Sequence, residues 1–326
     1  MSVFTPVSVD EARAFVAPYQ VGDIIDFQNI AAGVENSNFF VTTTRGRYVL
    51  TIFEKIPRTD LDYYLGLMFH LHEAGLPCAA PILARDRAML GTLHGKPAAL
   101  VQRLNGNDIA HPKPDDCRAV GAALAELHLK AKSFQGHMAN WRGLSWWREY
   151  AHALEKHLSA REKQAISAEL EFQAGFEALN LPRGHIHGDL FRDNVLWDDH
   201  GTHHTPQMID FYFACEEQLL FDVAVTVNDW CLDFAFYPNA RLNNANTAAL
   251  LQGYAAVRAF EPAELKAWPQ MLRAAALRTW LGRLGYHHFP RSSELTHPKD
   301  HAFTERLLAF HVSEMKMQQD LIEAAA

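Results

Sequence analysis

The stretch HIHGDLFRDNVLW, residues 185–197, is the most informative part of the chain. It places Asn194 five residues after Asp189, and QMIDFYF then places Asp210 behind a short apolar run, 21 residues after Asp189. Carboxylate and amide oxygens are suitable ligands for a hard cation such as Mg²⁺. We therefore expect Asn194 and Asp210 to bind a metal ion close to Asp189.

This combination favours a phosphoryl-transfer centre. Phosphoryl transfer depends on positioning and charge neutralisation, with little covalent chemistry left for the protein. A five-residue loop can present a carboxylate and an amide on one side, so Asp189 is the candidate catalytic base for an acceptor hydroxyl. For the loop alone, a Gly-Asp turn followed by a capping Asn194 is an equal alternative, and Asp210 decides in favour of function.

The same loop contains H-x-H-x-D, which resembles a metal-ligand run of metallo-β-lactamase-type hydrolases. That run needs a second histidine directly after the aspartate, where this chain has Leu190. The downstream pair His203 and His204 lies in a polar stretch typical of a solvated hairpin. We therefore expect His187 to brace the catalytic loop through backbone hydrogen bonds.

The composition of the 326 residues argues against several classes of protein. A net charge of −8 disfavours binding to nucleic acid or to an anionic membrane, since both need a basic surface. No apolar run is long enough to span a bilayer, and the N-terminus lacks the pattern of a signal peptide. The four cysteines show no C-x-x-C spacing, which indicates a reducing compartment, so we expect a cytoplasmic protein.

Hydrophobic periodicity divides the chain into a β-rich part and a helical part. Residues 24–54 are rich in β-branched and aromatic residues broken by turn residues, which predicts three strands. Two β-hairpins are expected within 184–213, where short apolar runs alternate with turns. The other expected elements are strands at 81–93 and 97–104 and helices at 6–20, 60–74, 115–132, 144–180 (one or two), after 216 and at 302–324.

These elements predict an α+β protein of two lobes. We place a small lobe built on an antiparallel sheet at residues 1–104 and a larger, mainly helical lobe at 105–326, with a linker near 105–111. The larger lobe would carry the catalytic and metal-binding loops and the substrate pocket. Ligands favour the cleft between two such lobes.

Two segments of the small lobe are candidates for binding a nucleotide. The hairpin in AAGVENSNFFV offers backbone and side-chain donors to phosphates at Gly33, Asn36, Ser37 and Asn38. The segment ALVQRLNG resembles a strand that enters a hinge, where backbone groups from Gln102 to Leu104 would bind adenine. The alternatives are an ordinary hairpin tip and a buried strand.

The set HGDLFRDN, IDF, FDVA and GVENSNF resembles the aminoglycoside phosphotransferase/choline kinase family, relatives of the protein kinases, over roughly residues 24–290. The resemblance implies a two-lobed protein-kinase-like fold and the use of ATP with Mg²⁺. It implies that Asp189 is the catalytic base, that Asn194 and Asp210 bind Mg²⁺ and that Asp222 braces the active-site loops. One departure is Thr51, which stands where relatives usually carry a lysine.

Within that family, HGDLFRDNVLW with YVLTIFE and VNDWC most resembles the branch that phosphorylates the hydroxyl of L-homoserine, a step of threonine biosynthesis. Another small acceptor (an amino alcohol, a sugar or an aminoglycoside) and a non-catalytic ATP-binding regulator are the alternatives. A zwitterionic acceptor needs an acid for its ammonium and a cation for its carboxylate. Asp229 and Asp233 are expected on one helical face. The candidate substrate residues are Arg192, Asn228, Asp229, Trp230, Asp233 and Arg283.

Overall fold

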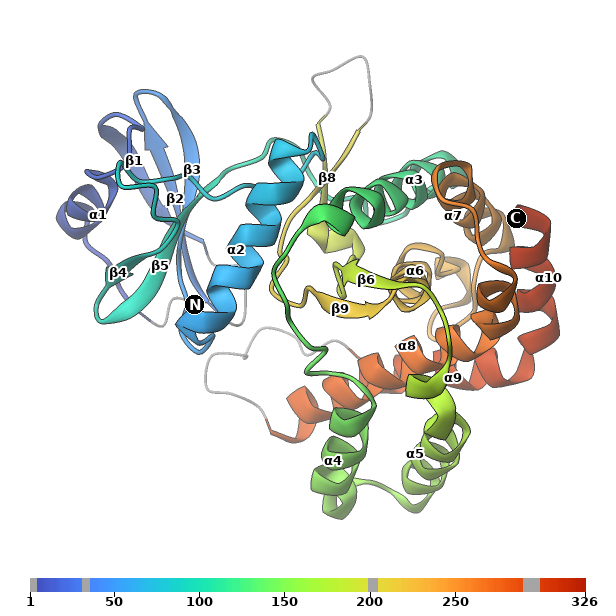
Figure 1. Ribbon diagram of the computed structural model, residues 1–326. Helices are drawn as coiled ribbons and strands as arrows, with labels where there is room; N and C mark the ends of the chain where they lie inside the picture. The colour runs from blue at the N-terminus through green and yellow to red at the C-terminus, as the bar shows by residue number, and fades with distance from the viewer. Residues whose placement is uncertain (1–4, 31–35, 199–204, 290–299) are drawn as a thin grey trace.

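The computed structural model describes residues 5–30, 36–198, 205–289 and 300–326, and these residues form two lobes (Figure 1). The small lobe is a five-stranded antiparallel sheet with strand order β1-β2-β3-β5-β4. Helices α1 and α2 lie on opposite sides of it (Figure 1). Its elements are α1 (Val9–Val16), β1 (Ile24–Asn29), β2 (Ser37–Thr43), β3 (Gly46–Ile52), α2 (Arg58–Glu73), β4 (Gly91–Leu93) and β5 (Lys96–Gln102).

The strand register sorts the side chains of this sheet into two faces. Phe39 pairs with Leu50, which pairs with Leu100, and this face packs against Phe15 of α1 in a small separate core. The opposite face carries Ala99 and Val101, which join the larger core together with α2. Since successive residues of a strand point to opposite faces, burial on both sides explains the continuous apolar run of β5.

The large lobe is mainly helical, with the β6–β9 strand pair near its centre and the β7–β8 pair on the side toward the small lobe (Figure 1). Its helices are α3 (Pro114–Lys130), α4 (Leu144–Leu154), α5 (Ala160–Phe172), α6 (Leu219–Trp230), α7 (Asn244–Val257), α8 (Pro262–His288), α9 (His301–Ser313) and α10 (Met315–Ala325). Strand β6 (Arg183–Ile186) pairs with β9 (Cys215–Gln218), and β7 (Val195–Trp197) pairs with β8 (Pro206–Met208). Short 3₁₀ helices cover Ala131–Ser133, Glu155–His157, Gln173–Ala178, Arg192–Asn194 and Phe234–Phe236.

The expected order of the small lobe, three strands, a helix and two strands, is confirmed. The strand predicted at 81–93 is confined to Gly91–Leu93, because the chain turns between Ala84 and Ala88. The expected terminal helix at 302–324 is interrupted at Glu314, which separates α9 from α10. Only one of the two expected hairpins is local: β7 and β8 form it, whereas β6 and β9 flank it and enclose the candidate catalytic loop.

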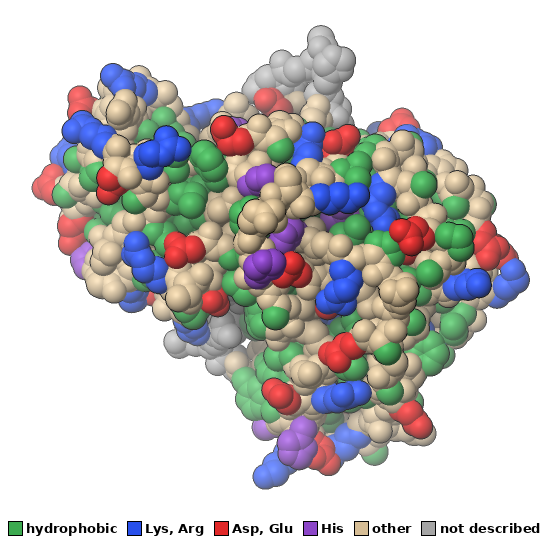
Figure 2. All heavy atoms as spheres, in the orientation of Figure 1, with side chains coloured by type: hydrophobic (Ala, Val, Ile, Leu, Met, Phe, Trp, Pro, Cys, Tyr) green, Lys and Arg blue, Asp and Glu red, His purple; other side chains and the backbone are tan. Residues whose placement is uncertain are grey.

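On the face drawn in Figure 2, acidic and basic side chains are interspersed over both lobes. No helix in the described ranges combines the length and the apolar character needed to cross a membrane. The buried residues of the smaller core lie between Phe15 and Leu100, while α2 belongs to the larger core. The boundary between residues 104 and 105 stays a prediction.

Helices α3 and α7 cross at unusually short range because each has a glycine at the contact. A Cβ on Gly121 would lie 2.1 Å from the carbonyl oxygen of Leu250, and a Cβ on Gly253 would lie 2.1 Å from that of Arg118. The two backbones therefore touch without an intervening side chain. This crossing fixes α3, which carries His128 toward the centre of the lobe.

We expect Gly253→Ala to destabilise the protein by about 1–3 kcal/mol, the usual cost of overpacking. Alanine favours a helix by about 1 kcal/mol over glycine, so a loss of stability would identify the clash as the dominant effect. Gly66→Ala in α2 is the matched control, because its Cβ would meet Phe134 at 3.4 Å, an ordinary contact. Urea unfolding should show the control equal to or above the parent, and equal stability of Gly253→Ala would contradict the close crossing.

A buried histidine connects the C-terminal helices to the rest of the lobe through hydrogen bonds. The Nε2 of His311 in α9 bonds to Oδ1 of Asn228 at 2.8 Å, and Gln318 of α10 donates to its Nδ1 at 2.7 Å. Burial lowers the pKa of His311 to about 3. Both ring nitrogens are thus used by the neutral imidazole.

This arrangement makes stability depend on pH below neutrality. The unfolded chain takes up a proton at His311 near pH 6.5, whereas the folded chain does so near pH 3, so stability falls as the pH falls between these values. The contribution is about 1.4 kcal/mol per pH unit. We expect His311→Gln to show a shallower loss of unfolding free energy between pH 6 and pH 4. Identical pH profiles in urea titrations would contradict this.

Candidate active site

The loop that carries Asp189 follows β6 and turns sharply at Gly188. This residue has φ of +75°, which favours glycine. A Cβ at Gly188 would lie 2.6 Å from the carbonyl oxygen of Phe213, in the turn that follows Asp210. Glycine is required both by the backbone conformation and by the close approach of the two loops.

A fully buried carboxylate accepts hydrogen bonds from the backbone of this loop. Asp222 of α6 accepts hydrogen bonds from the backbone N–H groups of His187 and Gly188, both at 2.8 Å. His128 of α3 donates its Nε2–H to the same carboxylate at 3.0 Å, and Tyr254 of α7 contacts the other ring nitrogen of His128 at 2.8 Å. Burial acts to raise the pKa of Asp222, but the hydrogen bond and charge of His128 hold this pKa below its usual value. These hydrogen bonds join α6 to the loop that carries Asp189, and the role of Asp222 in a reaction stays a prediction.

His187 links the catalytic loop to the segment that leads to Asp210. Its Nε2 donates to the carbonyl oxygen of Ile209 at 3.0 Å, and its Nδ1 accepts from the backbone N–H of Asp189 at 3.3 Å. Burial lowers the pKa of His187 and so favours the neutral form of the ring. Its contacts are with the backbone, as the sequence led us to expect.

Asn194 and Asp210 lie on adjacent loops. The Nδ2 of Asn194 donates to the carbonyl oxygen of Asp189 at 2.8 Å, so the amide oxygen is the atom that can serve as a ligand. The backbone N–H of Ile209 donates to the carbonyl oxygen of Asn194 at 3.0 Å and ties the two loops together. Asp210 is exposed and has φ of +63°, a strained conformation that clusters at functional sites.

These residues fit Mg²⁺ better than a metal held by protein ligands alone. Within the described residues, no group of three or more His, Cys, Asp and Glu side chains could hold a metal ion. Mg²⁺ is typically bound by one or two carboxylates together with substrate phosphates. One carboxylate and one amide oxygen form a partial set that a nucleotide would complete.

Arg278 of α8 is a site residue that the sequence analysis missed. Its Nη1 donates to Oδ1 of Asp189 at 3.1 Å, and its side chain is only 5% exposed. The sequence feature that could have identified it is a charged residue in a mainly apolar segment, because Arg278 lies in LRAAALRTWLGRL. A buried cation needs an anionic partner, and Asp189 provides it.

Three of the expected substrate residues meet in one hollow next to the catalytic loop. Asn228, Asp229 and Arg283 line it together with Phe191 and Thr279. Asp229 is already paired, because the backbone N–H and the Nε of Arg192 donate to it at 2.8 and 2.9 Å. The amide group of Asn228 is also engaged, with Leu272 and His311.

Two of the expected substrate residues have other contacts. Trp230 is fully buried and donates its indole N–H to the carbonyl oxygen of Leu190 at 3.0 Å, so it supports the loop and does not reach a ligand. The expectation that Asp229 and Asp233 share a helical face is wrong, because α6 ends at Trp230. Asp233 instead caps Phe234–Phe236 and pairs with Arg241 at 2.7 Å.

Some of the residues expected to bind the nucleotide have structural contacts as well. Gly33 lies outside the described residues, and Asn36 is buried just before β2. The hydroxyl of Ser37 is fully buried between Thr5 and Glu54, so it does not face a ligand. In the hinge, the N–H of Gln102 donates to Ala80 at 2.8 Å, while Leu104 lies beyond the last strand pair.

Thr51 lies on the inner face of the sheet and donates its hydroxyl to Oδ1 of Asn38 at 2.8 Å. A hydroxyl–amide bond therefore occupies the place where relatives usually carry a lysine. Lys55 is exposed, and Lys96 is paired with Glu54.

The two lobes form a protein-kinase-like fold, with the candidate catalytic loop between β6 and β9 of the larger lobe. The chain belongs to the phosphotransferase enzyme family, whose sequence profile matches residues 26–260. It is 43% identical over 313 residues to a homoserine kinase of Methylobacillus flagellatus, with 96% of each chain covered. It is 44% identical over 317 residues to a homoserine kinase of Paraburkholderia phymatum, covering 94% of this chain and 97% of the relative.

Among solved structures, the chain is similar to an amicoumacin kinase in complex with AMP-PNP and Ca²⁺. The TM-score is 0.70, with 15% sequence identity and coverage of 96% of this chain and 94% of that chain. The similarity at this identity concerns the fold, and it confirms the expected α+β, protein-kinase-like architecture.

Proposed function

We propose that this protein is a homoserine kinase, which transfers the γ-phosphate of ATP to the side-chain hydroxyl of L-homoserine with the help of Mg²⁺. The carrying observation is the 43% identity to a homoserine kinase over 96% of both chains. The loop geometry around Asp189 supports the same activity. The product would feed threonine biosynthesis, and we propose the cytoplasm as the place of action.

In this proposal Asp189 positions the acceptor hydroxyl. Arg278 donates to Oδ1 of Asp189, which leaves Oδ2 to accept the hydrogen bond from the hydroxyl and to receive its proton. The bonds from His187 and Gly188 to Asp222 fix the loop before the substrate arrives. Such preorganisation reduces the reorganisation needed during the reaction.

Asn194 and Asp210 would hold Mg²⁺, which supplies charge neutralisation on the phosphate groups when it is bound. Leu104 would contact adenine with its backbone, and Asn36 and Asn38 would contact the phosphates. With Thr51 in place of the usual lysine, the phosphates would depend more strongly on the metal and on backbone donors.

The acceptor is tested by a screen for ADP release. Purified protein with Mg²⁺-ATP is offered L-homoserine, L-serine, choline, 3-aminopropan-1-ol, a hexose and an aminoglycoside, and Asp189→Asn runs in parallel to exclude a contaminating kinase. We expect the highest kcat/KM with L-homoserine. Turnover of another class of acceptor without turnover of L-homoserine would refute the proposal. ATP binding without turnover of any acceptor would favour a regulator.

A further inference from the structure

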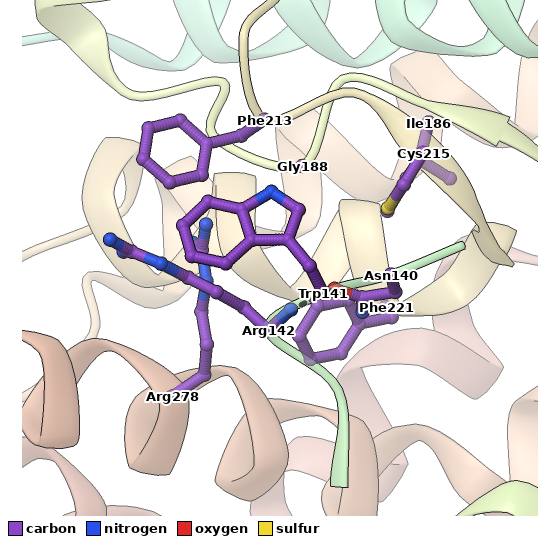
Figure 3. Close-up of a pocket in the computed structure, with 9 residues that line it drawn as sticks. All are labelled: Asn140, Trp141, Arg142, Ile186, Gly188, Phe213, Cys215, Phe221 and Arg278. Carbon is purple, nitrogen blue, oxygen red and sulfur yellow. Dashed lines mark hydrogen bonds between the residues drawn. The ribbon is translucent and has the colours of Figure 1, made fainter. Parts of the chain in front are cut away.

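Two arginines from distant parts of the chain converge beside the catalytic loop. Arg142 precedes α4 and Arg278 belongs to α8, and both line a small hollow together with Gly188 and Phe213. Figure 3 shows the two side chains approaching each other next to Trp141. Both guanidinium groups lie near the ring of Phe213, at 4.5 Å for Arg142 and 5.3 Å for Arg278.

The charges in this hollow do not balance. Arg278 is paired with Asp189, but no acidic side chain of the described residues pairs with Arg142. The Nε of Arg142 is buried and has no hydrogen-bond partner in the described part of the chain. Two cations and one carboxylate leave a net positive charge.

The aromatic rings orient Arg142 without neutralising it. Its guanidinium lies 4.6 Å from the ring centroid of Trp141 and 5.3 Å from that of Trp146. Stacking of this kind leaves the edge of the guanidinium plane free for a carboxylate, which it can bind through two parallel hydrogen bonds. Burial, with a further contribution from the charge of Arg142, lowers the pKa of Arg278, so an anion between the two would relieve their repulsion.

The place of the hollow suits the carboxylate of a small acceptor. Its cavity volume is about 10 Å³, roughly the room of one water molecule, so the hollow would take a carboxylate oxygen while the rest of the acceptor lies outside it. In an extended homoserine, the hydroxyl oxygen and the carboxylate carbon are about 5 Å apart, judged from standard bond lengths. Arg278 contacts Asp189 and lines the hollow together with Arg142, so the acceptor would place its hydroxyl on the Asp189 side of Arg278 and its carboxylate on the Arg142 side.

The neighbouring hollow at Arg283 is less suited to this carboxylate. Its acid, Asp229, is paired with Arg192, and Arg283 itself donates to the carbonyl oxygen of Asp300 at 3.2 Å. Its polar groups are therefore largely satisfied within the protein. Arg142 is the cation whose binding capacity is unused.

We propose that Arg142, supported by Arg278, binds the α-carboxylate of the amino-acid acceptor and so selects amino acids over amino alcohols. This proposal rests on the proposed function, because it assigns the acceptor subsite of the same reaction. Arg142 acts here as a specificity residue that touches the substrate but not the transferred phosphoryl group.

The test is the variant Arg142→Gln, with Arg148→Gln as the matched control. Arg148 is an exposed arginine of α4, six residues further along the chain. We expect Arg142→Gln to raise the KM and the dissociation constant of L-homoserine by about 10–100-fold, the effect of losing a hydrogen bond to a charged group. The kcat should stay within a few-fold, Arg142→Lys should recover part of the affinity, and Arg148→Gln should match the parent.

Calorimetric titrations with L-homoserine and with 3-aminopropan-1-ol, which lacks the carboxylate, show whether Arg142 binds the carboxylate or another part of the acceptor. The variant should lose affinity for the first and keep its affinity for the second. An unchanged KM for L-homoserine, or a fall in kcat with unchanged KM, would overturn the proposal, as would failure of the parent to bind L-homoserine. If the parent binds L-homoserine through Arg142 but does not phosphorylate it, the proposed function fails while this subsite stands.

Discussion

Replacing Asp189 with asparagine is expected to lower kcat by about 10²–10⁴-fold, the usual contribution of a positioned general base. Asparagine has nearly the same shape and can still accept a hydrogen bond from Arg278, but it cannot take the proton of the acceptor hydroxyl. Substrate binding should change much less than turnover. The measurement is steady-state ADP release with saturating L-homoserine and Mg²⁺-ATP.

A loss of activity has to be separated from a loss of fold, because the substitution removes the anionic partner of a buried arginine. Breaking a buried pair in this way typically costs about 3–5 kcal/mol. The melting temperature of the variant should therefore be measured in the same buffer, and turnover compared well below it. Asp115→Asn, an exposed carboxylate in the first turn of α3, is the control and should match the parent. Near-normal turnover of a folded Asp189→Asn protein would remove Asp189 from the mechanism.

The candidate catalytic loop could be proposed from the sequence because the chemistry proposed for it depends on closely spaced residues. The loop's Gly188, Asp189 and Asn194 form one short segment, and the spacing to Asp210 reflects a single hairpin between them. The strand and helix order of the small lobe followed from periodicity in the same local way. Such patterns hold wherever one face of an element is buried.

The proposed acceptor site could not be predicted in this manner, because its contacts join residues far apart in the chain. Arg278 meets Asp189 across 89 positions, and Arg142 approaches Arg278 only after α4 and α8 have packed. Nothing in the local spacing of VNDWCLDF indicated that α6 ends at Trp230, so the shared face of Asp229 and Asp233 was a false inference. A better signal was a charged residue in an apolar helix, since such a residue must find a partner in the fold.

In the small lobe as well, the sequence did not reveal which side chains contact each other across neighbouring strands. The sequence showed that Thr51 replaces a lysine, but only the structure shows that its hydroxyl bonds to Asn38 on the neighbouring strand. It also shows that the nearby Lys96 is held by Glu54. Among the described residues, no strand lysine lies on the face of the sheet that carries Thr51. The proposed enzyme should therefore depend on its metal site more than a relative with a lysine at this position does.

This dependence makes Asp210 the second position where a large effect is expected. Asp210→Ala should abolish the gain in nucleotide affinity that Mg²⁺ provides, and it should lower kcat by on the order of 10²–10³-fold, the size of effect seen when one electrostatic contact to a developing charge is removed. The measurement is calorimetric titration of ATP with and without Mg²⁺. Asp115→Ala should retain the difference between the two titrations.

The backbone at Asp210 calls for a second variant. Alanine at φ of +63° adds strain of about 1–2 kcal/mol, which could disturb the loop by itself. Asparagine adopts this conformation readily and keeps the size of the side chain, so Asp210→Asn removes the charge with little strain. If both variants lose the Mg²⁺ effect, the carboxylate is the ligand. If Asp210→Asn binds Mg²⁺-ATP like the parent, the negative charge of Asp210 is not needed and its assignment as a carboxylate ligand fails.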